Sequence, residues 1–77
     1  MPPETLGQRI RRERESRGWS QTHLAGLVGI TYVHLGRLER DSSEPSWYLM
    51  GKIAHAMGMG LADFEGLLPP QNLREQE

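Results

Sequence analysis

The sequence predicts an all-α fold, a compact domain of five short helices. Its 77 residues leave room for one domain only. Between short glycine- and proline-marked breaks, apolar residues recur at helical spacing, and no stretch alternates as a strand does. The domain is expected to span residues 1–68. Residues 69–77 carry almost nothing to bury and are expected to form a disordered C-terminal tail.

The first helix is predicted over about Thr5 to Arg17. Leu6 and Ile10 stand four residues apart, and Arg14 continues the same stripe. Gly18 is a natural C-terminal stop, because glycine adopts the left-handed conformation at little cost.

Two similar helices follow, each with a hydroxyl residue at its start. Ser20 can cap the second helix, which should end at Gly29. Thr31 can cap the third, which should run to about Arg40. Because barely three residues separate these helices, they must cross at a steep angle.

The last two helices are predicted from caps and apolar spacing. Ser46 can cap a fourth helix that stops at Gly58. Its apolar positions are Met50, Ile53, Ala54 and Met57. A fifth helix is expected over about Leu61 to Leu68, with Pro69 ending it.

The net charge of −1 hides an uneven distribution along the chain. Residues 9–40 carry seven arginines against three glutamates, a balance of +4, whereas residues 41–77 have a balance of −4 and residues 1–8 one of −1. Such a chain can present a basic face to a polyanion and keep an acidic face elsewhere. A solvated arginine-rich helix explains the same pattern.

Several classes of protein are disfavoured by what the sequence lacks. It has no cysteine, which excludes a disulfide framework, a thiolate zinc site and a cysteine nucleophile. The three histidines do not have metal-ligand spacing, so we expect no metal, and no arrangement of residues indicates catalysis or a cofactor; the histidines are His23, His34 and His55. With no signal peptide and no apolar run near the ~20 residues of a membrane span, we expect a cytoplasmic protein without a membrane partner.

The third helix has an unusual face. On a helical wheel, Leu35 and Leu38 point to one side, with Glu39 at the margin. The opposite side carries Val33, Gly36, Arg37 and Arg40, with Tyr32 at its edge. A glycine within a helix costs about 1 kcal/mol relative to alanine, which suggests that something must come close there.

Such a face suits the major groove of DNA. Arg37 can donate two hydrogen bonds to guanine, and Val33 and the Tyr32 ring can contact thymine methyl groups. Gly36 would let the backbone approach the bases. The alternative is a mobile surface with a tolerated glycine.

Four sequence segments carry a resemblance to a known family. They are Trp19-Ser-Gln-Thr-His-Leu-Ala25, Val28-Gly-Ile-Thr31, Leu35-Gly-Arg-Leu-Glu-Arg40 and Pro45-Ser46. Over residues 6–68 the chain resembles the Xre family of lambda-repressor-like helix-turn-helix transcriptional regulators. This resemblance implies a five-helix DNA-binding domain, usually dimeric on an inverted-repeat operator in double-stranded DNA. The DNA-binding positions that it implies are Gln21, Thr31, Tyr32, Val33, His34, Gly36, Arg37, Arg40, Ser42 and Ser43. Asp41 departs from the family, which usually has glycine there.

A buried ion pair is expected between the first and third helices. Arg14 lies on the apolar side of the first helix, where an unpaired charge is expensive. Glu39 lies on the matching margin of the third helix, and in the family these two positions pair. Two independent surface charges are the alternative.

A dimer is expected because one small module contacts few phosphates and bases. The surface proposed for it combines the fifth helix with the end of the fourth: Met59, Phe64, Leu67 and Leu68.

These expectations together indicate a dimeric, sequence-specific DNA-binding regulator that is not an enzyme. Its recognition helix would be residues 31–40. One alternative is an antitoxin or other interaction module that neutralises a partner protein, with DNA binding secondary. The other is a helical adaptor that does not bind DNA.

Overall fold

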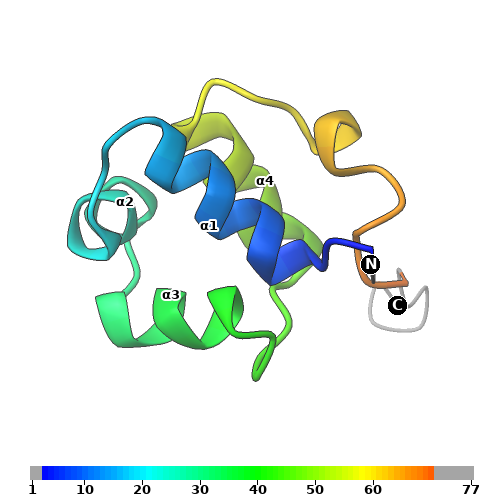
Figure 1. Ribbon diagram of the computed structural model, residues 1–77, viewed down its shortest axis with the longest axis horizontal. Helices are drawn as coiled ribbons and strands as arrows, with labels where there is room; N and C mark the ends of the chain where they lie inside the picture. Colours follow the sequence, from blue (N-terminus) through cyan, green and yellow to red (C-terminus); the bar gives the residue numbers. More distant parts are fainter. Residues whose placement is uncertain (1–2, 71–77) are drawn as a thin grey trace.

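Four α-helices and one 3₁₀ turn pack around a shared apolar core in the computed structural model, which describes residues 3–70 (Figure 1). The α-helices are α1 (Leu6–Ser16), α2 (Gln21–Val28), α3 (Tyr32–Glu39) and α4 (Trp47–Ala56), and the 3₁₀ turn is η1 (Leu61–Phe64). Residues 3–70 contain no strand. The predicted all-α class is therefore confirmed.

The helices begin at the caps that the sequence predicts. The hydroxyls of Ser20, Thr31 and Ser46 each accept a hydrogen bond from the backbone amide three residues later. Gly29 ends α2 with φ at 87°, a conformation that favours glycine. Only three residues separate α2 from α3, and this short turn fixes how α3 leaves α2.

The fifth helix is shorter than predicted. It was expected over Leu61 to Leu68, but η1 ends at Phe64. The chain leaves the helix at Glu65, whose ψ of 138° is extended, and Gly66 completes the turn with φ at 87°, a conformation that favours glycine. The Leu67 amide then turns back to the Phe64 carbonyl at 3.0 Å.

The segment after η1 returns to α4. The indole N–H of Trp47 donates to the Pro69 carbonyl at 3.1 Å. Pro69, which the sequence assigns to the tail, is therefore bonded to the domain. The rest of the predicted disordered tail, 71–77, lies outside the described residues.

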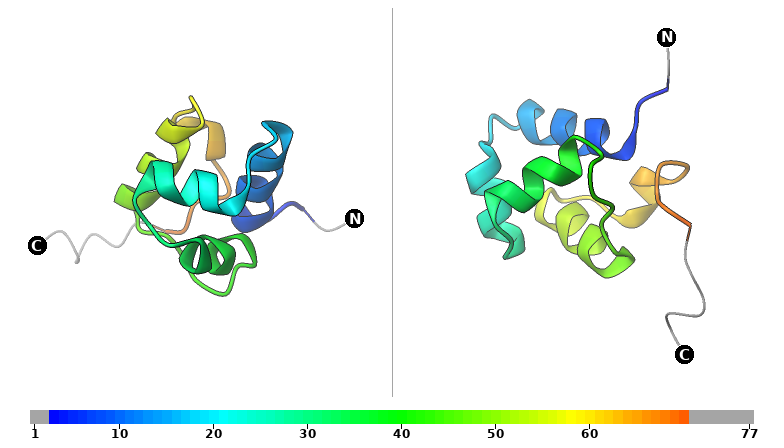
Figure 2. Two further views of the ribbon diagram at one scale, coloured as in Figure 1. Left: turned by 90° about the vertical axis from the view of Figure 1, so that its left-hand side faces the viewer. Right: turned by 90° about the horizontal axis from the view of Figure 1, so that it is seen from below.

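The apolar stripes of all the elements meet in one core, and α3 forms the underside of the molecule in Figure 1. The core residues are Leu6, Ile10, Leu24, Ala25, Val28, Leu35, Leu38, Met50, Ile53, Ala54, Met57 and Phe64. Seen from below, in the right view of Figure 2, the outer face of α3 is turned toward the viewer and α2 lies at one end. Within residues 3–70, no helix has the length and apolar character needed to cross a membrane.

Candidate nucleic-acid interface

A buried ion pair holds α3 against α1. Arg14 and Glu39 are both buried, and Arg14 Nε and Nη2 donate to the two oxygens of Glu39 at 2.7 and 3.0 Å. The third nitrogen of the guanidinium, Nη1, donates to the Trp19 carbonyl just before α2 at 2.8 Å. The hydrogen bond to Glu39 raises the pKa of Arg14. The predicted pair is present, and it links α1 to α3 and to the start of α2.

Gln21 joins the same carboxylate from α2. Its Nε2 donates to Glu39 Oε1 at 3.0 Å, and the side chain is half-buried at the start of the helix. The orientation of α2 relative to α3 is therefore set by a residue that the sequence assigns to DNA contact. The side-chain oxygen of Gln21 and one remaining amide hydrogen stay available for a ligand.

The outer face of α3 carries most of the predicted reading positions. Tyr32 is 58% exposed and Val33 is 46% exposed, which is unusual for large apolar side chains. Arg37 is exposed on the same helix, while His34 is half-buried beside this face. Thr31 is exposed and accepts the His34 amide, so its hydroxyl hydrogen is free to donate.

The predicted place of Gly36 is wrong. This glycine is buried, whereas the wheel sets it on the solvent-facing side. A Cβ atom at Gly36 would lie 3.1 Å from Arg40 Nη1 and 3.6 Å from Gln21 Nε2. Those two side chains cover the glycine. The wheel missed this because it gives only directions around one helix and takes no account of the long Arg40 side chain lying over the glycine or of Gln21 on α2.

The arginines of α1 are paired with carboxylates. Arg9 and Arg17 both donate to Glu13, at 2.7 and 3.0 Å, and these hydrogen bonds lower the pKa of Glu13. Two further pairs on this helix are Arg11 with Glu15 at 3.2 Å and Arg12 with Glu4 at 2.7 Å. The α1 part of the +4 segment is therefore largely neutralised within the protein.

Arg37 and Arg40 are the arginines of residues 3–70 that have no carboxylate partner. Both are exposed near the C-terminal end of α3. The described surface therefore carries its free guanidinium groups on the predicted recognition element. Guanidinium is the side-chain group best suited to bidentate contact with guanine or phosphate.

The turn after α3 holds Ser42 in hydrogen bonds within the protein. The Ser42 hydroxyl donates to the Arg37 carbonyl at 3.2 Å, and the Ser42 amide donates to the same oxygen at 3.0 Å. Ser42 must give up one of these bonds before it can donate to phosphate. Ser43 is half-buried beside it, and Asp41 adopts a left-handed conformation with φ at 60°.

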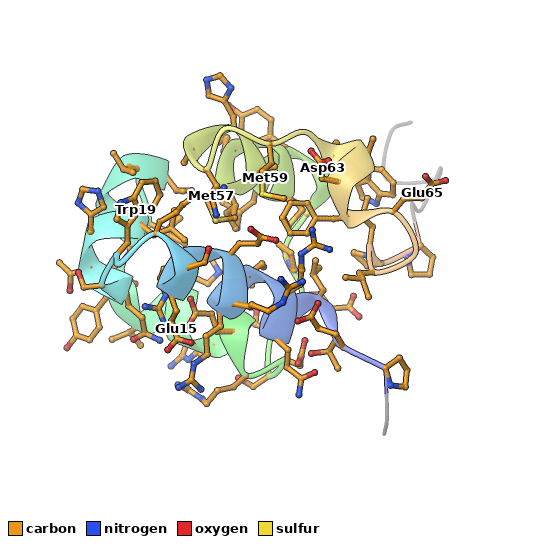
Figure 3. The ribbon with its side chains drawn as sticks, turned by 45° about the horizontal axis from the view of Figure 1, so that its top comes forward. Glu15, Trp19, Met57, Met59, Asp63 and Glu65 are labelled. Carbon is orange, nitrogen blue, oxygen red and sulfur yellow. The ribbon has the colours of Figure 1, made fainter. Side chains whose placement is uncertain are left out.

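One of the four predicted dimer residues is wrong. Phe64 is fully buried in the core, under the guanidinium of Arg9, which lies 5.3 Å from the ring centroid. Met59, which follows α4 close to Met57 (Figure 3), is half-buried, as are Leu67 and Leu68. Phe64 therefore has no apolar surface to offer a second subunit.

Sequence reasoning missed the exposure of Leu27 and Tyr48 and the buried position of Gly7. Leu27 and Tyr48 are 53% and 78% exposed and line a surface groove between α2 and α4. Gly7 is buried where α1 meets the end of α3. The burial of Gly7 could have been predicted from the sequence. Gly7 precedes Ile10 by three residues and Arg14 by seven, which places it on the buried side of the same helix.

Comparison with known proteins gives the family. A helix-turn-helix family model matches residues 10–64, most of the chain. This chain belongs to the helix-turn-helix family. The resemblance to Xre-type regulators is thereby confirmed.

The relatives of this helix-turn-helix chain are described as regulators. The HTH-type transcriptional regulator SutR of Escherichia coli K12 is 33% identical over 67 residues, which cover 87% of this chain and 36% of SutR. A regulator of Mycobacterium tuberculosis H37Rv, described as uncharacterized, is 34% identical over 68 residues, 88% of this chain and 27% of that protein. The chain thus spans about a third of the length of these curated relatives.

Solved structures with the same helix-turn-helix fold include DNA complexes. The P22 c2 repressor in complex with a synthetic operator is 26% identical, with a TM-score of 0.75 covering 90% of this chain and 100% of that chain. The restriction-modification controller protein C.AhdI from Aeromonas hydrophila is 33% identical, with a TM-score of 0.72 covering 74% and 86% of the two chains.

Proposed function

We propose that this protein is a sequence-specific DNA-binding transcriptional regulator that inserts α3 into the major groove. The observation that carries the proposal is the composition of the outer face of α3. This face combines free guanidinium groups with exposed Tyr32 and Val33 in a family whose solved members include operator-bound repressors. The curated relatives, described as transcriptional regulators, support the same assignment.

Within the proposed site, base reading and backbone contact fall to different residues. Arg37 donates two hydrogen bonds to guanine, and Val33 with Tyr32 contacts thymine methyl groups. Thr31, His34, Arg40 and Ser43 flank these positions and serve as backbone or secondary contacts. Ser42 contributes only after its hydroxyl leaves the Arg37 carbonyl.

Gln21 has a double role in the proposal. It remains bonded to Glu39 while its free amide hydrogen and oxygen face the DNA from the start of α2. The N-terminus of α2 carries a partial positive charge that favours phosphate nearby. Contact with DNA would therefore be linked directly to the buried ion pair.

The proposed active form is a homodimer. Two copies of α3 about one DNA turn apart would double the footprint and read an inverted repeat. Met59, Leu67 and Leu68 supply the proposed contact, without Phe64. Because this contact is small, DNA binding itself would contribute to dimer formation.

Selection of bound sequences from random DNA tests the proposal, because a dimer should select a symmetric consensus sequence.

Mutation tests the assignment of residues. On the selected duplex, Arg37→Ala should weaken binding about 5- to 100-fold, the effect of losing one bidentate base contact. The matched control is Arg12→Ala, whose guanidinium is already bonded to Glu4, and it should change affinity less than about twofold. Unchanged binding by both Arg37→Ala and Gln21→Ala would contradict the assignment.

A further inference from the structure

The first turn of α1 lies directly against the end of α3. Gly7 marks this contact, because a Cβ atom there would lie 2.6 Å from the Glu39 carbonyl oxygen and 2.8 Å from Asp41 Oδ1. It would also overlap the Leu38 carbonyl oxygen. The two helix ends are therefore packed as closely as backbone atoms allow, and only glycine fits between them.

Asp41 fastens this contact. Its Oδ1 accepts the Gly7 amide at 3.0 Å, and its Oδ2 accepts the Thr5 hydroxyl. Thr5 in turn caps α1, since its hydroxyl oxygen accepts the Gln8 amide at 3.1 Å. The carboxylate that ends the recognition helix thus sits on the N-terminus of α1, where the helix dipole favours a negative charge.

The backbone of Asp41 gives a second, independent observation. Its φ of 60° is a conformation that glycine adopts readily and other residues adopt at a cost. The turn it forms returns the Asp41 amide to the Leu38 carbonyl and the Ser42 amide to the Arg37 carbonyl. An aspartate in this position gives up the conformational ease of glycine and gains the two bonds to α1.

A carboxylate at this position would otherwise oppose DNA binding. It lies directly after Arg40, in the turn that the proposed function sets beside the phosphate backbone. A carboxylate left free in the turn would repel phosphate. Bonded to the Thr5 hydroxyl and the Gly7 amide, it is held by donors and directed at α1.

We propose that Asp41 is a positioning residue for DNA recognition, which holds the C-terminal end of α3 on α1 so that Arg37 and Arg40 are presented in one orientation. With the Arg14–Glu39 pair, the C-terminal end of α3 is then held on α1 by two residues that stand two positions apart. This inference rests on the proposed function. It goes beyond that function because Asp41 fixes the orientation of Arg37 and Arg40 without itself contacting DNA.

The test compares two neutral substitutions at the same position. Asp41→Gly relaxes the left-handed backbone but removes both bonds to α1. Asp41→Asn tolerates the same backbone and keeps an oxygen that can accept the Gly7 amide. Because both remove the charge, any electrostatic effect on DNA binding is shared, and the difference between them reports positioning.

We expect Asp41→Gly to bind the selected duplex roughly five- to tenfold more weakly than Asp41→Asn, about the effect of one lost hydrogen bond. Asp41→Asn should stay within about twofold of the wild type, and binding to a scrambled duplex should be equal for the two variants. If Asp41 only stabilised the fold, Asp41→Gly would lose affinity for the selected and the scrambled duplex to the same extent. Equal operator binding by the two variants, or tighter binding by Asp41→Gly, would overturn the proposal.

Amide hydrogen exchange of the free protein separates this inference from the proposed function. In Asp41→Gly, but not in Asp41→Asn, the Gly7 amide loses its acceptor and should exchange at least about tenfold faster. Unchanged exchange in Asp41→Gly would overturn the fastening role even if DNA binding were altered. If the wild type itself bound no duplex, the proposed function would fail, and with it the DNA part of this inference, while exchange would still decide the link between α1 and α3.

Discussion

At the residue scale, the most consequential group is the Glu39 carboxylate. It accepts hydrogen bonds from Arg14 on α1 and from Gln21 on α2 while belonging to α3. No buried side-chain nitrogen or oxygen within residues 3–70 lacks a partner. A fully satisfied buried network of this kind specifies one arrangement of the helices that contribute to it.

Replacing Glu39 by glutamine should therefore be costly. Glu39→Gln leaves the buried Arg14 guanidinium with only the more distant Glu15 carboxylate, 4.0 Å away, as a counter-charge, and we expect a loss of about 3 kcal/mol in the free energy of unfolding. The exposed pair of Arg11 with Glu15 gives a matched control, because Arg11→Gln breaks that pair without touching Arg14 and should cost no more than about 0.5 kcal/mol. Urea unfolding followed by circular dichroism measures both. Equal losses in the two variants would show that the buried pair contributes no more than a surface pair.

At the element scale, the helix termini decide the architecture. Short turns and hydroxyl caps start α2, α3 and α4, while close backbone contact joins α1 to the end of α3. Two buried glycines occur at helix contacts, and they differ in what surrounds them. Gly7 faces backbone carbonyls, whereas Gly36 faces the ends of two long side chains.

Alanine substitutions should separate these two glycines. Gly7→Ala forces a methyl group against backbone that cannot move aside, and we expect it to destabilise the protein by about 1–3 kcal/mol. Gly36→Ala requires only that the Arg40 guanidinium shift slightly, and alanine gains up to about 1 kcal/mol in helix propensity. Thermal unfolding should therefore give a lower midpoint for Gly7→Ala and an unchanged or higher one for Gly36→Ala. A large loss in Gly36→Ala would mean that Gln21 and Arg40 are held rigidly over it.

The elements also show how far sequence reasoning reaches. Caps such as Ser20 and Thr31 act within one turn, so local sequence predicts them well. What covers a face depends on neighbours far along the chain. That is why the predicted exposure of Phe64 was wrong. Gly36 is covered partly by such a neighbour, Gln21 of α2, and partly by the long side chain of Arg40, four residues further along. The pairing of Arg11 with Glu15 was readable from its four-residue spacing, whereas the contact of Asp41 with Gly7 needed the fold.

At the scale of the whole molecule, unpaired positive charge occupies a smaller part of the protein than the arginines do along the sequence. The +4 balance of residues 9–40 already counts Glu13, Glu15 and Glu39, and the pairing of Arg12 with Glu4 lowers it by one. Within residues 3–70, five of the seven arginines of this segment have a carboxylate partner, so its unpaired guanidinium groups are those of Arg37 and Arg40. Figure 3 shows Asp63 and Glu65 on the η1 segment, at the end of the molecule away from Trp19. Few free cations remain to neutralise phosphates, so the salt dependence of DNA binding should be shallow for a protein of this class.

Self-association is a property of the whole molecule that sedimentation can measure. We expect sedimentation velocity to detect dimers at micromolar concentration, and Leu68→Asp should shift the protein to monomer by burying a charge in the contact. Leu27→Asp is the control, because this exposed residue lies in the groove between α2 and α4, outside the proposed contact. A wild-type protein that stayed monomeric under these conditions and also bound the selected duplex as a single copy would contradict the dimer. Dissociation by Leu27→Asp alone would move the contact to that groove.

The bond between Gln21 and Glu39 has a consequence for how this protein can evolve. A substitution at position 21 alters DNA contact and the internal bracing of α2 and α3 together, so selection on one property constrains the other. Positions 32, 33 and 37 are exposed on the reading face and carry no such bracing bond from their side chains. New operators can therefore be acquired through those three positions with little loss of folding stability, whereas a change at position 21 also removes the bond that braces α2 against α3.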